Sequence, residues 1–115
     1  MKLISPKFHG YLDYLVVAVF AAAPSFFHFS MLPMAVSYAL AVIHLALTLL
    51  TDFPLGAFKV VPLPWHGIIE MVVGPCLAAL PFAFGMTAEP DAEYFYVAAG
   101  AVIFLAWSLT DYGRK

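Results

Sequence analysis

The sequence has very little charge for its length. Charged residues make up 10% of its 115 residues and hydrophobic residues make up 64%, whereas an ordinary soluble domain carries about 25% charged residues. A folded chain of this size leaves a large share of its surface exposed, and too few polar side chains are present to cover that surface. The composition therefore indicates a membrane protein whose apolar side chains face the lipid bilayer.

Cysteine and basic residues are scarce as well. The single cysteine, Cys76, lies in an apolar run, so a disulfide within the chain and a cysteine-rich zinc site are both excluded. The formal net charge of −2 offers no basic patch, and we expect no nucleic-acid partner. The sequence also lacks a phosphate-binding glycine loop and a nucleophile elbow. No enzymatic reaction follows from it.

Four long apolar stretches are present, at about residues 8–27, 33–53, 65–84 and 93–112. Each is close to the roughly 20 residues that a helix needs to cross the hydrocarbon core of a bilayer. The connections between them are short, and short connections favour antiparallel neighbours. We therefore predict an all-α fold, an integral membrane four-helix bundle that forms a single transmembrane domain over residues 1–115.

The basic residues are confined to the two termini and the central connection: Lys2, Lys7, Lys59, Arg114 and Lys115. An even number of spans puts these three places on the same side of a membrane. Lysine and arginine are enriched in cytoplasmic segments. We expect a multi-pass protein of the bacterial inner membrane with both its N-terminus and its C-terminus in the cytoplasm.

The first half of the sequence is similar to the second half. A shift of 57 residues aligns His9-Gly10 with His66-Gly67 and Asp13 with Glu70. A shift of 59 aligns the Thr-Asp-aromatic triplet at 51–53 with the triplet at 110–112. We interpret the chain as a helical hairpin used twice, at about 2–53 and 59–112. A unit with an even number of spans repeats in parallel, so an axis along the membrane normal should relate the two hairpins.

A proline falls at the same place in each hairpin, within Ala23-Pro24-Ser25 and within Leu80-Pro81-Phe82. A two-span unit with a proline-centred motif in its first helix resembles the SPW-repeat family of small bacterial membrane proteins. Only the proline of that motif is present in either hairpin. The resemblance implies a duplicated hairpin in a membrane and no particular biochemical activity.

Ionisable side chains lie within the predicted first and third helices, where a membrane makes them costly and commonly functional. His9 and Asp13 are four residues apart and therefore share a face of the first helix. His66 and Glu70 repeat this spacing on the third helix. The first and third helices of an up-down bundle are diagonal. We expect these four residues, here called the His/carboxylate cluster, to meet across the bundle axis.

The second helix carries further polar residues at the same spacing. His44, Thr48 and Asp52 follow one another at intervals of four and should share one face. The fourth helix has Ile103 where the second has His44, and Trp107 where it has Thr48. The candidate site is therefore expected to be one-sided, with extra polar groups on the second helix alone. At the end of that helix Asp52 is expected to lie beside the cytoplasm as a solvated carboxylate with a structural role.

Three kinds of chemistry fit these residues. In the first, the His/carboxylate cluster binds an iron, zinc or manganese ion, with His44 as a further ligand or as a partner of one. In the second, two of the histidines His9, His44 and His66 hold a haem b, and the carboxylates orient the imidazoles. Either cofactor would serve redox chemistry or sensing. In the third, the same groups form a proton or ion pathway without a cofactor.

A purely structural interpretation is open as well. Histidines near the start of a helix can reach interfacial water, and carboxylates can pair with them only to satisfy their own charge. The protein would then be an accessory subunit whose polar cluster fixes helix packing. Because the chain is small, we expect a homodimer or a larger membrane complex.

Overall fold

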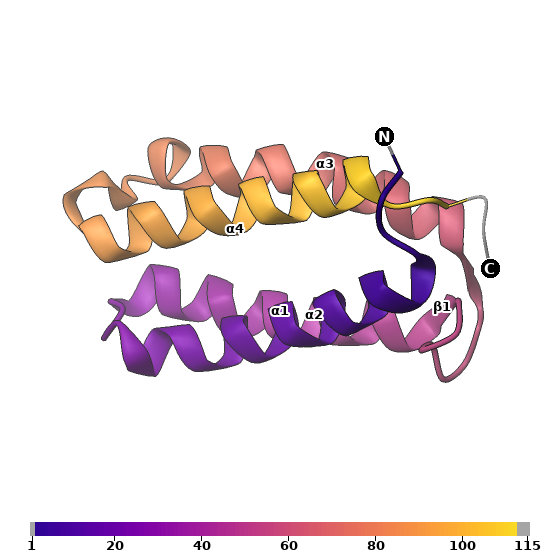
Figure 1. Cartoon of the computed structure of the whole chain (residues 1–115). Helices are drawn as coiled ribbons and strands as arrows, with labels where there is room; N and C mark the ends of the chain where they lie inside the picture. Colours follow the sequence, from indigo (N-terminus) through magenta and orange to yellow (C-terminus); the bar gives the residue numbers. More distant parts are fainter. Residues whose placement is uncertain (1, 113–115) are drawn as a thin grey trace.

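The computed structural model describes residues 2–112, which form four long helices in two antiparallel hairpins (Figure 1). The first hairpin consists of α1 (Pro6–Phe26) and α2 (Met31–Leu50), and the second of α3 (Leu63–Ala83) and α4 (Pro90–Leu109). The connections contain the strands β1 (Thr51–Asp52) and β2 (Val61–Pro62) and the short 3-10 helix η1 (Met86–Ala88). The prediction of an all-α protein with four helices is confirmed.

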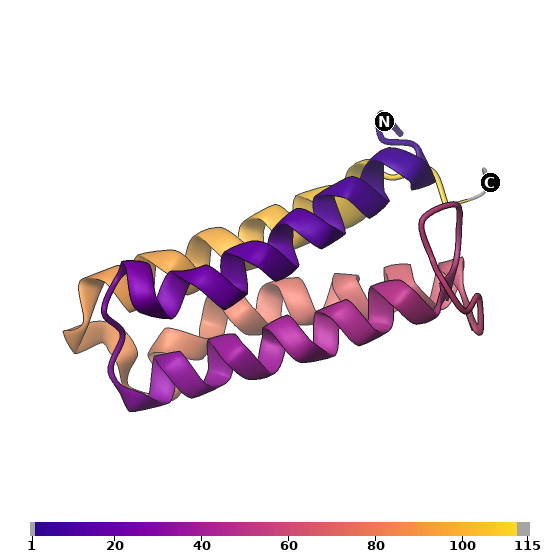
Figure 2. The same ribbon diagram turned by 90° about the horizontal axis from the view of Figure 1, so that it is seen from below.

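The two hairpins lie side by side and form a four-helix bundle. Both termini and the connection between the hairpins lie at one end, and the α1–α2 and α3–α4 turns lie at the other (Figures 1 and 2). Helix α1 lies next to α4, and α2 next to α3, so α1 and α3 are diagonal (Figure 2). Lys2 and Lys59 belong to the end with the termini, whereas Arg114 and Lys115 are outside the described residues.

Three of the helices, α2, α3 and α4, are long and apolar enough to cross a membrane. Helix α1 is as long as α3, at 21 residues, but Lys7, His9 and Asp13 lower the mean hydropathy of its first half. The outer surface of the bundle carries large apolar side chains such as Ile43 and Val72, which are 63% and 54% exposed. Such a surface is unusual for a water-soluble monomer and is the pattern expected of a bundle that faces lipid.

Each helix starts two or three residues before the predicted position. Ser5 caps α1 by accepting a hydrogen bond from the backbone N–H of Phe8, and prolines occupy the first turns of α1, α3 and α4. Proline suits these positions because its fixed φ is helical and its missing N–H would have no partner there. The cap of α1 and the prolines of α1, α3 and α4 thus mark where these helices start, and hydropathy alone locates the starts only approximately.

The prediction that Asp52 continues the polar face of the second helix is wrong. Helix α2 ends at Leu50, and Thr51 and Asp52 are extended and pair with β2 in parallel. Backbone N–H groups of the following loop, those of Ala57 and Val60, bond to the carbonyls of Leu49 and Leu50. The loop therefore satisfies the last carbonyls of the helix and stops it, which leaves the Asp52 side chain exposed.

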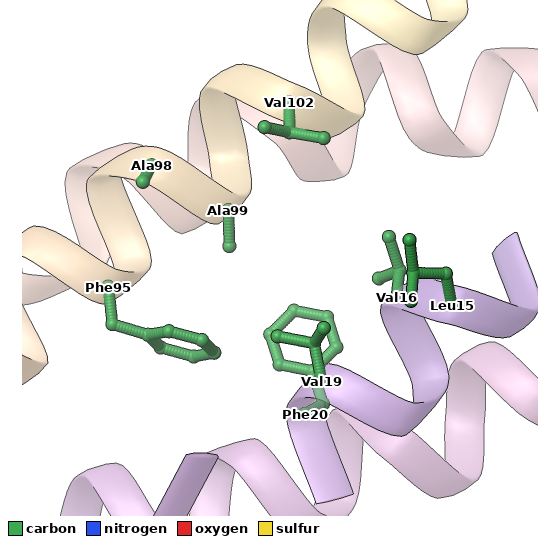
Figure 3. A pocket seen from close by; sticks show the side chains of 8 residues that line it. All are labelled: Leu15, Val16, Val19, Phe20, Phe95, Ala98, Ala99 and Val102. Atoms are coloured by element: carbon green, nitrogen blue, oxygen red, sulfur yellow. The ribbon is translucent and has the colours of Figure 1, made fainter. Parts of the chain in front are cut away.

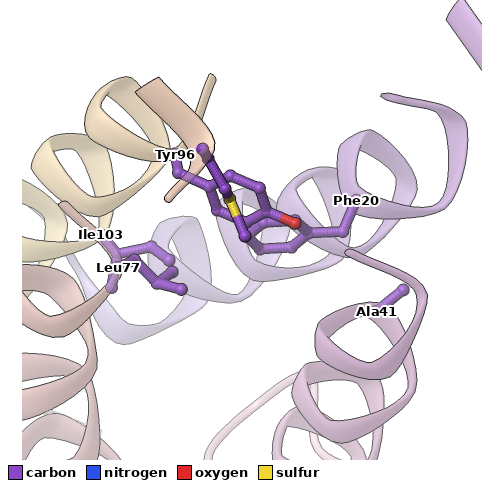
Figure 4. Packing of buried hydrophobic residues seen from close by; sticks show 6 residues of the cluster. Phe20, Ala41, Leu77, Tyr96 and Ile103 are labelled. Carbon is purple, nitrogen blue, oxygen red and sulfur yellow. The ribbon is translucent and has the colours of Figure 1, made fainter. Parts of the chain in front are cut away.

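Apolar side chains fill the bundle between its middle and the end with the two turns (Figure 4). The buried members of this core come from all four helices and from η1: Phe20, Ala41, Leu77, Met86, Tyr96 and Ile103. The one hydroxyl group among them, that of Tyr96, donates a hydrogen bond of 2.7 Å to the carbonyl of Pro33. The nearby buried hydroxyl of Ser37 likewise donates a hydrogen bond, to the carbonyl of Phe20, so the interior on this side is apolar and these two hydroxyls are both satisfied.

Helices α3 and α4 approach each other at Gly74 and Gly100. A Cβ atom on Gly100 would lie 2.4 Å from the carbonyl oxygen of Gly74 and 2.6 Å from the backbone nitrogen of Ala78. Both of these atoms belong to backbone, which cannot turn aside as a side chain can. Small residues at helix contacts commonly permit such close approach in membrane bundles.

Gly100→Ala should therefore separate α3 from α4 and lower the free energy of unfolding by about 1–3 kcal/mol, the usual cost of overpacking. Thermal or denaturant unfolding in a mild detergent, followed by circular dichroism, measures the change. Ala101→Val enlarges the next residue, which is exposed, and should leave stability nearly unchanged. Equal stability of the two variants would contradict this account of the contact.

Candidate metal centre

The four members of the His/carboxylate cluster meet across the bundle axis. Helix α1 contributes His9 and Asp13, and the diagonal helix α3 contributes His66 and Glu70. Each of the four residues is at most 2% exposed. One potential ligand atom of each lies within 4.8 Å of those of the other three. The structure thus brings together the two pairs that were expected to face each other.

The contacts between the helices are as close as those within them. His9 Nε2 lies 2.7 Å from Glu70 Oε1 on the other helix and 3.2 Å from Asp13 Oδ1 on its own. His66 Nε2 lies 3.0 Å from Asp13 Oδ2 and 2.9 Å from Glu70 Oε1. Each imidazole therefore contacts both carboxylates, so the four side chains form one compact group.

Two buried atoms of the cluster lack hydrogen-bond partners within the described residues, His66 Nε2 and Asp13 Oδ2. They lie 3.0 Å apart, but the angles between them are not those of a hydrogen bond. Buried polar atoms almost always have a partner, so two such atoms side by side are informative. Both are in ion-pair contact within the cluster, since His66 Nε2 lies close to Asp13 Oδ2 and to Glu70 Oε1.

Two threonine hydroxyls hold the outer ring nitrogens of the histidines. Thr110 Oγ1 lies 2.6 Å from His9 Nδ1, and Thr51 Oγ1 lies 2.7 Å from His66 Nδ1. Each hydroxyl donates its only proton to the backbone carbonyl four residues earlier. Its oxygen must then accept a hydrogen bond from the imidazole. The proton of both histidines is therefore fixed on Nδ1, and Nε2 faces the carboxylates.

The two threonines are placed by matching pieces of extended backbone. Thr51 pairs with Val61 just before α3, and Thr110 pairs with Ile4 just before α1, both in parallel. The segment that follows the second helix of one hairpin thus supports the histidine of the other hairpin. The sequence aligns these threonines with each other but gives no sign of their role, because their partners come from the opposite half of the chain.

Aromatic rings cover the cluster at the end with the termini. Phe53 packs near His66, with ring centroids 6.1 Å apart, and Tyr112 packs near His9 at 5.8 Å. Gly10 and Gly67 make room for these rings, since a Cβ would lie 2.5 Å from the Phe53 ring at Gly10 and 2.8 Å from the Tyr112 ring at Gly67. The rings separate the cluster from water on that side.

The hydroxyl of Tyr112 is itself buried and, among residues 2–112, has no hydrogen-bond partner. Burial raises the pKa of this hydroxyl, and the negative charges of Glu70 and Asp13 raise it further. The hydroxyl therefore stays neutral and can act as a donor towards the carboxylates. At the matching position of the first hairpin stands Phe53, which has no such group.

The polar residues of α2 have three different fates. His44 joins the cluster from one side, with Nε2 3.3 Å from Asp13 Oδ1. Thr48 is buried and donates a hydrogen bond to the backbone carbonyl of His44, within its own helix. Asp52 is exposed beyond the end of the helix. The one-sided extension of the site therefore consists of His44 alone.

Comparisons of this chain with known protein families, with curated proteins and with solved structures find no significant match. The resemblance to the SPW-repeat family stays a prediction. The chemistry of the cluster is accordingly argued from its own geometry.

Thr110→Val should leave the Nδ1–H of His9 buried without an acceptor, and we expect the free energy of unfolding to fall by about 1–3 kcal/mol. Thr51→Val should have a similar effect through His66. Thr110→Ser keeps the hydroxyl and should recover most of the loss. Denaturant unfolding in a mild detergent compares the variants. A serine variant no more stable than the valine variant would show that the methyl group, and not the hydrogen bond, matters.

Proposed function

We propose that this protein is a four-span protein of the bacterial inner membrane that binds one first-row divalent metal ion, iron, zinc or manganese, for redox chemistry or sensing. The metal would lie in the His/carboxylate cluster near the cytoplasmic face. Three apolar helices support the membrane location. Helix α1 fits as the fourth span because its ionisable residues His9 and Asp13 are buried inside the bundle. Basic residues at the end with the termini support the orientation.

The single observation that carries the metal proposal is the pair of unpartnered atoms in the cluster. His66 Nε2 and Asp13 Oδ2 are within ion-pair distance of each other but have no hydrogen bond, and ligand atoms of all four residues lie within 4.8 Å of one another. A cation among these ligand atoms would satisfy them all at once. Imidazole with carboxylate suits iron, zinc and manganese, and helical bundles build such sites from inward-facing side chains.

The charges of the cluster also support a divalent ion. The hydrogen bonds from the threonines fix the Nδ1 protons, so each Nε2 either holds a second proton or offers a lone pair to a metal. Two such protons neutralise the charges of Asp13 and Glu70, and a divalent cation does the same. With neither, two buried carboxylates would share a dry site, which is strongly unfavourable. The cluster is therefore suited to exchange two protons for one metal ion.

The geometry favours a bare metal ion over haem b. The space that reaches His44 and Glu70 has a volume of about 50 Å³, whereas sites for drug-sized ligands span about 300–1,000 Å³. A porphyrin between His9 and His66 would also have to separate imidazoles whose ring centroids are 5.5 Å apart. A proton pathway is disfavoured because the apolar core around Phe20 and Tyr96 lies between the cluster and the other end of the bundle.

The two hairpins are best explained as copies of one duplicated unit. The bridge between Thr51 and Val61 has its counterpart between Thr110 and Ile4. The hydrogen bond between Thr51 and His66 likewise has its counterpart between Thr110 and His9. These paired contacts support a parallel repeat about an axis along the bundle. Duplication would explain why two equivalent His and carboxylate pairs meet at one depth.

Protein purified in mild detergent and loaded with Fe²⁺, Zn²⁺ or Mn²⁺ should retain about one equivalent of metal, measured by elemental analysis after desalting. His9→Ala and Glu70→Gln should each abolish retention, because each removes a ligand. His28→Asn is the matched control, since His28 lies in the α1–α2 turn with a φ of 54°, which asparagine also adopts. Retention by all three variants would refute the site, and a Soret band would point to haem instead.

Metal binding should release about two protons for each divalent ion near neutral pH, because the Nε2 protons must leave before the lone pairs can bind. Calorimetric titration in two buffers of different ionisation enthalpy measures this number. Binding without any proton release would show that protons on the histidines do not neutralise the carboxylates before the metal binds.

Thr110→Val frees the His9 ring and should weaken metal binding by about 10–100-fold, as losses of ligand-orienting partners do.

A further inference from the structure

Two apolar grooves open on the sides of the bundle where the hairpins meet. One lies between α1 and α4, has a volume of about 270 Å³ and is lined by apolar side chains of these two helices alone (Figure 3). The other lies mainly between α2 and α3 and has a volume of about 50 Å³. Both openings lie along the apolar flanks of the bundle, which face the lipid if the helices span a membrane.

The two grooves occupy equivalent places under the proposed duplication. The shifts that align the hairpins, 57 for the first helix of each and 59 for the second, also align residues that line the grooves. The matched pairs are Phe20 with Leu77, Ala99 with Leu40, and Val102 with Ile43. One groove is therefore the counterpart of the other. Differences between their lining residues then indicate which of the two can lead to the cluster.

The grooves differ in the polarity of their lining residues. The α2–α3 groove is lined by His44 and Glu70, so it reaches the His/carboxylate cluster. At the position on α4 that matches His44 stands Ile103, and the α1–α4 groove contains no side chain of the cluster. Among the ionisable residues of the site, His44 is the most exposed, at 9%. Of these two grooves, the α2–α3 groove is therefore the one that connects the cluster with the side of the bundle.

The size and lining of the α2–α3 groove restrict what can pass through it. A water molecule needs about 10–15 Å³ of such space, so about 50 Å³ accommodates only a few heavy atoms. All of its lining residues except His44 and Glu70 are apolar. An ion or a strongly hydrated solute would lose its water on entering and gain few partners in return. A small uncharged molecule that dissolves in hydrocarbon meets no such barrier.

We propose that the α2–α3 groove admits small uncharged diatomic gases, such as dioxygen or nitric oxide, from the bilayer to the metal in the cluster. This inference rests on the proposed metal site and names the class of ligand that the site takes. His44 and Glu70 form the polar wall at the inner end of the groove, where the gas meets the cluster. The α1–α4 groove has no such function, because it does not reach the cluster.

The test uses nitric oxide as the probe and Fe²⁺-loaded protein in nanodiscs under anaerobic conditions. Nitric oxide binds ferrous iron through an iron–nitrogen bond and gives a distinct absorption and electron paramagnetic resonance signal. Ile43→Trp fills the rim of the α2–α3 groove and should slow the association of nitric oxide by about tenfold, because the filled groove must open by local motion. Val102→Trp fills the matching rim of the α1–α4 groove and should leave the rate unchanged.

The two tryptophan variants form a matched pair, since Ile43 and Val102 are 63% and 53% exposed and can accept a larger side chain. Ile69→Trp, on the α3 side of the same groove, replaces Ile43→Trp if that variant does not fold. Iron content is measured first in every protein. If the parent protein holds no iron, the metal site and the gas route are both overturned.

If all the proteins hold iron and the rates of nitric oxide association are equal, the metal site stands and the groove is overturned as the route. An acyl chain lodged in the groove would also give this result, because the parent protein would already be blocked. Equal slowing by Ile43→Trp and Val102→Trp would likewise overturn the proposal, since it would show no preference for one side.

Discussion

The structure depends on the mutual compensation of two buried imidazoles and two buried carboxylates. These charges come from diagonal helices, so they must be satisfied in the middle of the bundle or not at all. Taking even one partner away would leave an uncompensated charge in a dry interior, which is among the most destabilising changes a protein can suffer. The threonine hydroxyls, the short parallel bridges and the covering aromatic rings all serve to hold these four side chains in position.

The same compensation links the two hairpins. Each hairpin places its histidine towards the carboxylate of the other and supplies the threonine that orients the other's imidazole. Under the proposed duplication this is a reciprocal arrangement, in which neither hairpin completes a site alone. Among the differences between the hairpins, two change the polar groups beside the cluster: His44 stands opposite Ile103, and Tyr112 opposite Phe53. His44 contacts Asp13 and Tyr112 packs near His9, so the surroundings of the cluster are not symmetric.

The surroundings of the cluster define how a ligand can reach it. Aromatic rings close the end with the termini, and the apolar core around Phe20 and Tyr96 closes the path towards the other end. The side between α2 and α3 is where a groove touches the cluster. A metal placed there would be shielded from water and would meet molecules that dissolve in lipid. This is a suitable setting for sensing or redox chemistry of small gases.

The sequence by itself determined the four helices and the residues that share a face, because hydropathy and the helical period are local properties. It therefore predicted that His9 and Asp13 would meet His66 and Glu70. Only the tertiary structure decided what depends on backbone contacts outside the helices. The loop that stops α2 at Leu50 removes Asp52 from the site, and the bridges to the opposite hairpin bring the threonine hydroxyls to the histidines. The contacts of Thr110 with His9 and Ile4 join the two ends of the chain. Those of the loop with Leu49 and Leu50 reach beyond one helical turn, so neither hydropathy nor the helical period records them.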